Sequence, residues 1–213
     1  MIRLEVWGDY ACFTRPELKS ERMSYDVPTP SAARGLVEAI YYHPGLCWKI
    51  DRIYVLNPIQ FVTIRRNEVK NKCSALTAKH AAIQKKPLYL AAAQEIVQRS
   101  SLVLRHVRYV IEAHFVMTDR AAPGDNPGKF QDMVTRRIRR GQCFHTPYLG
   151  CREFPAHFRP FEGQTIPAIA QTRDLGLMLY DFDYTDPQKM IPTYFRAKLQ
   201  QGVVNVAGCE VLR

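Results

Sequence analysis

The 213-residue chain carries 30 lysines and arginines against 20 acidic residues, which gives a net charge of +10 and a pI near 9.4. Hydrophobic residues make up 46% of the chain, enough to build a core and to exclude a largely disordered protein. A charge this far from zero attracts polyanions. We therefore favour a nucleic-acid partner over an ordinary basic enzyme or an anionic membrane surface.

The chain offers no targeting or membrane signal. Its start, Met-Ile-Arg-Leu-Glu-Val, is typical of a strand rather than a signal peptide, and no stretch approaches the ~20 apolar residues of a membrane span. We therefore expect a soluble, cytoplasmic protein with no membrane partner and with reduced, scattered cysteines. These are Cys12, Cys47, Cys73, Cys143, Cys151 and Cys209.

The first elements follow from periodicity and capping. Residues 2–7 alternate apolar and polar side chains, which predicts a half-buried strand. Thr29 followed by Pro30 is typical of a helix start, and Pro44-Gly45 ends that helix. Residues 50–56 and 59–66 then predict two strands joined at a turn.

A basic segment follows at residues 65–100. It holds eight lysines and arginines against two glutamates, so +6 of the net charge lies in one sixth of the chain. The run from Pro87 to Gln98, rich in Ala, Leu and Gln, predicts a helix. We expect this segment to be an insertion that projects from the sheet.

The clearest strand is predicted at residues 103–117, where apolar and polar side chains alternate. A helix follows, with an apolar stripe of Phe130, Val134 and Ile138. Its last turn holds four arginines, more than the helix dipole needs, which predicts a phosphate-binding patch. These are Arg136, Arg137, Arg139 and Arg140.

The order of elements predicts an α+β fold. With a strand near 150–158, the order matches the βαββαβ plan of ferredoxin-like (RRM-like) RNA-binding modules. A strand at 175–184 and short strands near Gly202 and Gly208 then predict a small C-terminal antiparallel β-sheet. We expect a ferredoxin-like domain over residues 1–145 and a C-terminal β appendage over 146–213.

Several strings resemble a known family. The most specific are Thr-Pro-Ser-Ala-Ala-Arg-Gly-Leu-Val-Glu-Ala-Ile-Tyr at 29–41 and Pro-Tyr-Leu-Gly-Cys-Arg-Glu-Phe at 147–154. Weaker strings are Gly-Asp-Tyr-Ala-Cys-Phe-Thr-Arg-Pro-Glu at 8–17 and Arg-Arg-Asn-Glu-Val at 65–69. Together they resemble the CRISPR-associated Cas-five family of subtype I-C (Dvulg subtype) over nearly the whole chain.

The resemblance implies a function. Proteins similar to this one cut precursor CRISPR RNA within each repeat, without a metal or other cofactor. They then stay on the 5′ handle as a subunit of the type I-C interference complex, Cascade. The expected partners are thus CRISPR repeat RNA and other Cascade subunits, with duplex DNA as a further candidate. The positions expected to bind RNA are Arg34, Arg65, Arg66, Lys70, Lys72, Arg136, Arg137, Arg139 and Arg140.

Metal-free RNA cleavage uses the substrate's own 2′-hydroxyl as nucleophile, and it needs a base, a cation at the phosphate and an acid for the leaving oxygen. The family's site is a Tyr ending the first helix and a Lys-His pair beginning the second. Tyr41 and Lys129 match, but Phe130 stands where the His would be. We take His145 as the candidate base, with His43 as the other histidine near a helix end.

Three hypotheses remain open. The chain is an endoribonuclease, or a non-catalytic RNA-binding subunit, which Phe130 would favour, or a nonspecific nucleic-acid binder that also holds duplex DNA. A zinc site is the weakest alternative, because the spacing of its four candidate ligands matches no standard zinc pattern. Those four are Cys143, His145, Cys151 and His157.

Overall fold

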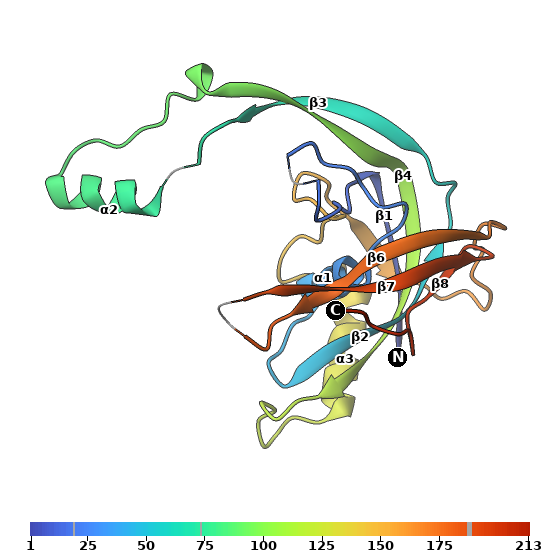
Figure 1. Cartoon of the computed structure of the whole chain (residues 1–213). Coiled ribbons are helices and arrows are strands. Elements are labelled where there is room, and N and C mark those ends of the chain that lie inside the picture. Colours follow the sequence, from blue (N-terminus) through green and yellow to red (C-terminus); the bar gives the residue numbers. More distant parts are fainter. Residues whose placement is uncertain (19, 73, 187–188) are drawn as a thin grey trace.

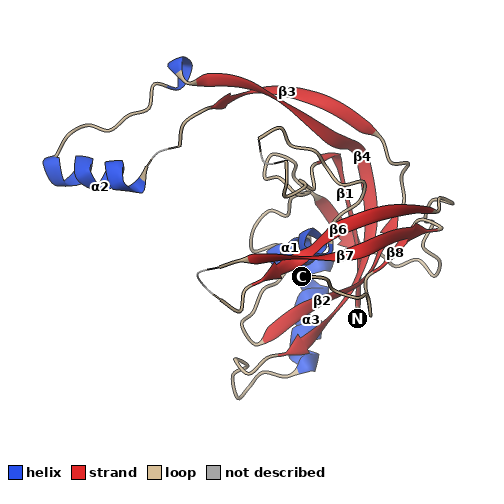
Figure 2. Ribbon diagram, viewed as in Figure 1, coloured by secondary structure: helices blue, strands red, loops and turns tan. Residues whose placement is uncertain are grey.

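Antiparallel strands form the framework of the molecule in the computed structural model, which describes residues 1–18, 20–72, 74–186 and 189–213. The strands are β1 (Ile2–Ala11), β2 (Leu46–Val55), β3 (Phe61–Val69), β4 (Ile96–Met117), β5 (His157–Pro160), β6 (Arg173–Asp183), β7 (Ile191–Gln200) and β8 (Val203–Asn205). The helices are α1 (Pro30–Ile40), α2 (Ala75–Gln84), the 3-10 turn η1 (Ala92–Gln94) and α3 (Pro127–Arg139). The fold is thus mixed α/β, with few helices (Figure 2).

The strands are joined edge to edge in the order β5-β1-β4-β2-β8-β7-β6, and every neighbouring pair is antiparallel. β3 lies off this path and pairs only with the first half of β4. Helices α1 and α3 pack on the sheet, with α1 against β2 and β6 and α3 against β5 (Figure 1). The C-terminal strands β6 and β7 therefore belong to the same sheet, because β8 pairs with both β7 and β2.

β1 confirms the predicted alternation. Ile2, Leu4 and Val6 are buried in the core, as a half-buried strand requires. Glu5, on the opposite face, is also buried, because Arg108 and Arg159 from the two neighbouring strands pair with its carboxylate. Paired guanidinium groups make a buried carboxylate tolerable.

The start of α1 and the buried stripe of α3 are as the sequence predicts. The Thr29 side chain accepts a hydrogen bond from Ala32 N, and Pro30 takes the first helical position of α1. In α3 the predicted stripe of Phe130, Val134 and Ile138 is buried. The helices therefore direct these apolar faces to the core and leave their polar faces exposed.

The described residues of 61–102, called the arm below, form a twisted two-stranded ribbon that carries α2 at its far end (Figure 1). The arm projects from the rest of the described chain, which is called the body. The helix predicted from Pro87 to Gln98 is wrong: α2 lies earlier, at Ala75–Gln84, and residues 96–98 belong to β4. Local composition favoured a helix there, but pairing of Ile96 with Val69 overrides that propensity.

Two predictions in the C-terminal third have different outcomes. The strand predicted near 150–158 is displaced to β5, at His157–Pro160, because residues 147–156 form a turn-rich loop. Gly150 has a φ of +85° in that loop, and a Cβ there would overlap the Cys12 carbonyl. The strand predicted at 175–184 is confirmed as β6. None of the described helices has the length and apolar character to cross a membrane.

Candidate functional site

The C-terminal end of α1 and the N-terminal end of α3 lie close together in the body. Tyr41 ends α1 with extended backbone, so its side chain turns away from the helix direction. Asn126 caps α3 by accepting a hydrogen bond from Lys129 N at 2.9 Å. The backbone at these two helix ends therefore fixes the positions from which the Tyr41 and Lys129 side chains extend.

Tyr41 is nearly enclosed, with 3% of its surface exposed. Its hydroxyl donates to Met133 Sδ at 3.4 Å, and Arg137 Cζ lies 5.2 Å from its ring centre. Burial raises the pKa of Tyr41, an effect that the nearby Arg137 and Lys129 oppose. The phenol therefore stays protonated at neutral pH and is a donor rather than a base.

Lys129 makes an ion pair one helical turn back along the chain. Its Nζ lies 2.9 Å from Asp125 Oδ1, and the Asp125 side chain is 3% exposed. The hydrogen bond to Asp125 raises the pKa of Lys129. Lys129 is thus a half-exposed, permanently charged cation whose position Asp125 holds, next to Tyr41.

Phe130 is fully buried, and its ring contacts three other rings. The centroid of Tyr41 lies 6.2 Å away, that of His43 4.8 Å and that of Phe115 6.1 Å. Phe130 therefore has a packing role. The imidazole that reaches the cluster is that of His43, which packs on Phe130.

One ring nitrogen of His43 accepts a hydrogen bond, and the other faces a carboxylate. Its Nδ1 accepts from Gly45 N at 3.0 Å, and its Nε2 lies 3.9 Å from Asp125 Oδ2. In the neutral ring this places the proton on Nε2, facing the carboxylate that also binds Lys129. His43, Asp125 and Lys129 therefore lie together as one polar group. Sequence reasoning missed Asp125, although its four-residue spacing from Lys129 suits an ion pair.

His145 lies elsewhere. Its backbone N donates to Ala39 O at 3.0 Å, and its ring packs on Phe144 with centroids 4.3 Å apart. It lines a cavity along α1. No hydrogen bond, ion pair or ring contact joins it to Tyr41 or Lys129 in the part of the chain that the structure describes.

The four arginines at the end of α3 do not share one direction. Arg137 points inward, where its Nη1 donates to Ile40 O at 2.9 Å at the carboxyl end of α1. Arg136, Arg139 and Arg140 are exposed, and Arg139 lines a small cavity beside Glu162. Of the four, Arg137 is the one that the structure brings to Tyr41.

Of the remaining candidate cations, some are exposed on the arm and others make ion pairs with residues of the body. Arg65, Lys70 and Lys72 are exposed on the arm. Arg66, on the other face of β3, pairs with Glu153 of the body. Arg34 binds Asp181 and Glu38 through both sides of its guanidinium, at 2.8–3.0 Å, and so ties α1 to β6.

The cysteines are distributed singly, apart from one pair. Cys12 and Cys151 both approach the Thr14 hydroxyl, at 3.5 and 3.8 Å. The described cysteines are free thiols, and Cys73 lies outside the described residues. No three metal-ligating side chains gather at one point among the residues that are described.

Comparison with known proteins identifies relatives over almost the full length. A family described as CRISPR-associated protein (Cas_Cas5) matches residues 1–207. A protein of Mannheimia succiniciproducens named CRISPR pre-crRNA endoribonuclease Cas5d is 47% identical, over 96% of this chain and 94% of its own. A protein of the same name from Thermus thermophilus is 40% identical, over 96% and 90%.

The fold is also similar to a solved one. A crystal structure of a CRISPR-associated protein superposes with a TM-score of 0.70 at 23% identity, covering 100% of this chain and 96% of that one. At this identity the likeness shows the fold alone.

Proposed function

The chain belongs to the CRISPR-associated Cas5 family, and on this premise we propose that it is an endoribonuclease that cleaves precursor CRISPR RNA within its repeats. The observation that carries the proposal is the full-length similarity to two proteins named CRISPR pre-crRNA endoribonuclease. The cluster of Tyr41, Lys129 and His43 supports it, because it supplies the groups that metal-free cleavage needs.

In the proposed reaction the 2′-hydroxyl of the RNA attacks the adjacent phosphorus, and the bond from phosphorus to the 5′-oxygen breaks. The proton of the 2′-hydroxyl passes through water and an imidazole to the leaving 5′-oxygen. Lys129 and Arg137 are the cations that stabilise charge on the phosphorane oxygens. Tyr41, kept protonated by burial, donates a hydrogen bond once its hydroxyl exchanges Met133 for substrate. The products would be a 2′,3′-cyclic phosphate and a 5′-hydroxyl.

We assign the proton-transferring imidazole to His43 rather than His145. His43 packs on Phe130, which stands at the position of the family's histidine, and its Nε2 faces the carboxylate that holds Lys129. His145 belongs to a different cavity. His43 would therefore supply the imidazole that Phe130 cannot provide.

The decisive experiment is cleavage of the cognate repeat RNA in EDTA, with the product ends identified. We expect a 2′,3′-cyclic phosphate, no change on chelation, and a loss of rate of about 10²–10³-fold in Lys129→Ala with RNA affinity retained. His43→Ala should lose rate by a similar factor.

Matched controls are Lys79→Ala, an exposed lysine of the arm, and His145→Ala. Both should keep the single-turnover cleavage rate at saturating RNA within about twofold of the wild type, because neither contacts the cluster, and any loss of RNA affinity is measured separately. Full activity in Lys129→Ala would remove the role proposed for this residue. Equal losses in the two histidine variants would remove the distinction between them.

One observation favours a second function, that of a non-catalytic RNA-binding subunit. Phe130 is buried and cannot carry a proton. Tight binding of the repeat with no product over hours would establish this alternative. In either case we propose that the chain stays on the 5′ handle as a Cascade subunit, and that the basic arm also contacts duplex DNA.

We also propose that the N-terminal part of the chain is a ferredoxin-like domain. The order β5-β1-β4-β2, with α1 and α3 as the two connections, supports a ferredoxin-like sheet into which β3 and α2 are inserted. The sequence predicts this domain over residues 1–145 and the appendage over 146–213, but β5, the fourth strand of the sheet, lies at His157–Pro160. We therefore propose that the boundary follows β5, and separate expression of residues 1–160 as a folded, RNA-binding fragment would support the division.

A further inference from the structure

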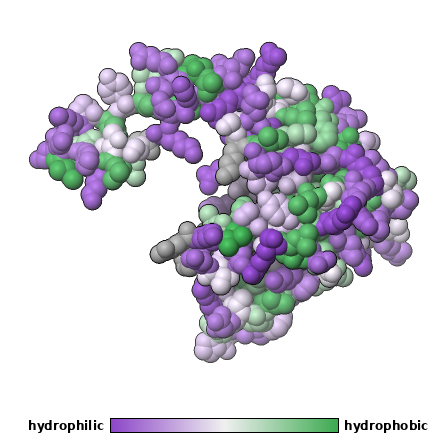
Figure 3. All heavy atoms as spheres, viewed as in Figure 1, coloured by the Kyte–Doolittle hydropathy of each residue, from purple (hydrophilic) through white to green (hydrophobic). Residues whose placement is uncertain are grey.

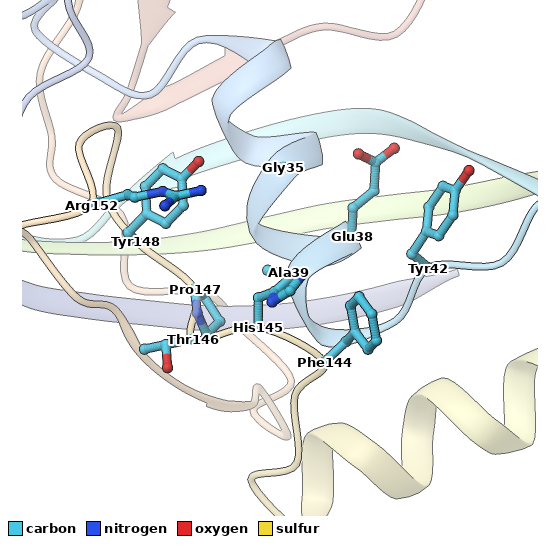
Figure 4. A pocket seen from close by; sticks show the side chains of 10 residues that line it. All are labelled: Gly35, Glu38, Ala39, Tyr42, Phe144, His145, Thr146, Pro147, Tyr148 and Arg152. Carbon is cyan, nitrogen blue, oxygen red and sulfur yellow. The ribbon is translucent and has the colours of Figure 1, made fainter. Parts of the chain in front are cut away.

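A groove with a volume of about 690 Å³ runs along α1 from Gly35 to Tyr42. Figure 4 shows Tyr42 and Phe144 beside the C-terminal end of α1, and Tyr148 with Arg152 on the side of Gly35. A volume of this size admits a nucleotide-sized ligand. The lining also includes Glu38, Ala39, His145, Thr146 and Pro147.

Three aromatic rings in this groove are exposed to solvent. The exposed fractions are 56% for Tyr42, 67% for Phe144 and 41% for Tyr148. Other aromatic rings of the body include buried ones such as Trp48 and Tyr109, and exposed ones outside the groove such as Tyr184. Exposed rings in one concave place are suited to stack on unpaired nucleobases.

The backbone holds these rings in position. Because Tyr41 is extended, consecutive side chains point to opposite sides, so Tyr42 faces the groove while Tyr41 faces α3. The backbone N of Phe144 and that of His145 both donate to Ala39 O, at 2.8 and 3.0 Å. The loop that carries Phe144 is therefore attached to the end of α1.

Gly35 provides a second, independent observation. It lies in the middle of α1, where glycine costs about 1 kcal/mol relative to alanine. A Cβ at this position would meet no atom within 4 Å, so no packing contact within the protein requires glycine. Its absent side chain keeps the floor of the groove open.

The polar groups of the groove suit RNA rather than an apolar protein segment. Arg152 is exposed and makes no ion pair within the described residues. Glu38 uses one carboxylate oxygen for Arg34, at 2.8 Å, and the other is available to accept from a base. A guanidinium beside stacked bases neutralises phosphate.

The groove also adjoins the candidate catalytic cluster. Phe144 lines a second, smaller cavity together with Arg137, whose guanidinium lies over the Tyr41 ring. We propose that the groove binds unstacked bases of single-stranded RNA next to the cleaved phosphate, between the rings of Tyr42, Phe144 and Tyr148. This inference rests on the proposed function, since it places the RNA by the cluster at which cleavage is proposed.

The test uses the full chain and repeat RNA made uncleavable by a 2′-deoxy sugar at the mapped cut site. 2-Aminopurine replaces one base at a time on either side of that site, and its fluorescence is titrated with protein. We expect quenching at one or two adjacent positions. Tyr42→Leu, Phe144→Leu and Tyr148→Leu should each reverse the quenching and weaken binding roughly tenfold. Tyr148→Phe should behave as the wild type.

Two further variants separate stacking from stability. Gly35→Leu should fill the groove and weaken binding roughly tenfold, while its melting temperature stays equal to or above that of the wild type. Tyr184→Leu removes a ring of similar exposure, 58%, outside the groove, and should change neither signal.

The outcomes are distinguishable from those of the cleavage assay. Unchanged fluorescence and affinity in all three leucine variants would overturn the inference, even if the wild type cuts the repeat. The same holds if the variants bind RNA normally but fail to bind a partner subunit, because the groove would then be a protein contact. If quenching is position-specific but the protein never cuts the repeat, the proposed cleavage is refuted and the binding of bases in the groove is supported.

Discussion

The body and the arm of this molecule are built on different principles. In the body, α3 buries a stripe of Phe130, Val134 and Ile138, and the strands bury their alternate side chains. In the arm, α2 has no buried residue among those described, and Leu76 and Ile83 are each 69% exposed. Figure 3 shows hydrophilic surface along much of the arm, which curves away from the body.

Under the proposed function, the body would supply the groups that cleave RNA and the arm the positive charge that binds it. The body positions a few groups to within hydrogen-bonding distance of each other, as Asp125 does for Lys129. The arm presents charge on a ribbon that needs no such precision, because attraction to phosphates depends on the number of cations more than on their exact placement. We therefore expect damage in the body to act on stability and rate, and damage in the arm to act on affinity.

The largest effect should come from the core of the body. Phe130→Ala removes a ring packed against Tyr41, His43 and Phe115, and we expect it to lower the free energy of unfolding by about 3–5 kcal/mol. The matched arm variant Leu76→Ala should change it by less than about 0.5 kcal/mol. Urea denaturation measures both. Similar losses in the two variants would mean that α2 packs on the body.

Removing the far part of the arm should give the next largest effect. Lys70 N donates to Glu95 O at 2.8 Å, so an Asn-Gly turn in place of residues 71–94 would close the hairpin at this hydrogen-bonded pair. We expect unchanged unfolding of the body, repeat-RNA affinity reduced by about 10²-fold at low salt, and a shallower salt dependence. An unchanged salt slope would show that the arm makes no phosphate contact.

These two regions also differ in what the sequence could predict. Burial leaves a periodic signal, so β1, the Thr29 cap and the α3 stripe follow from the residues alone. α2 buries nothing, so Ala- and Gln-rich composition was the only guide in the arm and misplaced the helix. Tyr41 and Lys129 came from resemblance, but the partnership of His43 with Asp125 depends on how two helix ends meet, which periodicity does not encode.

A smaller effect should distinguish the arginines at the end of α3. Arg137 lies over the Tyr41 ring and binds the Ile40 carbonyl, whereas Arg139 is exposed on another side. We expect Arg137→Gln to slow single-turnover cleavage roughly tenfold and Arg139→Gln to change it less than twofold. If both slowed cleavage alike, the four arginines would act as one phosphate patch, as their sequence spacing predicts.

The smallest effect concerns a buried carboxylate of the body. Burial alone would raise the pKa of Glu5, but hydrogen bonds from Arg159 and Arg108 outweigh it and lower the pKa below its ordinary value. A lowered pKa in the folded state means that Glu5 stabilises the fold above its unfolded pKa of about 4.3. That stabilisation is lost as the pH falls from there through the lower, folded-state pKa.

Glu5→Gln should therefore cost about 1 kcal/mol at pH 7, and the difference from the wild type should shrink as the pH falls through this acid range. In the arm, Glu95 accepts a hydrogen bond from Asn71 at an exposed position, and Glu95→Gln should cost less at every pH. Thermal unfolding from pH 3 to 7 measures both. A Glu5→Gln deficit that grew as the pH fell would reverse the sign, because the arginine pairs would then destabilise the ionised carboxylate.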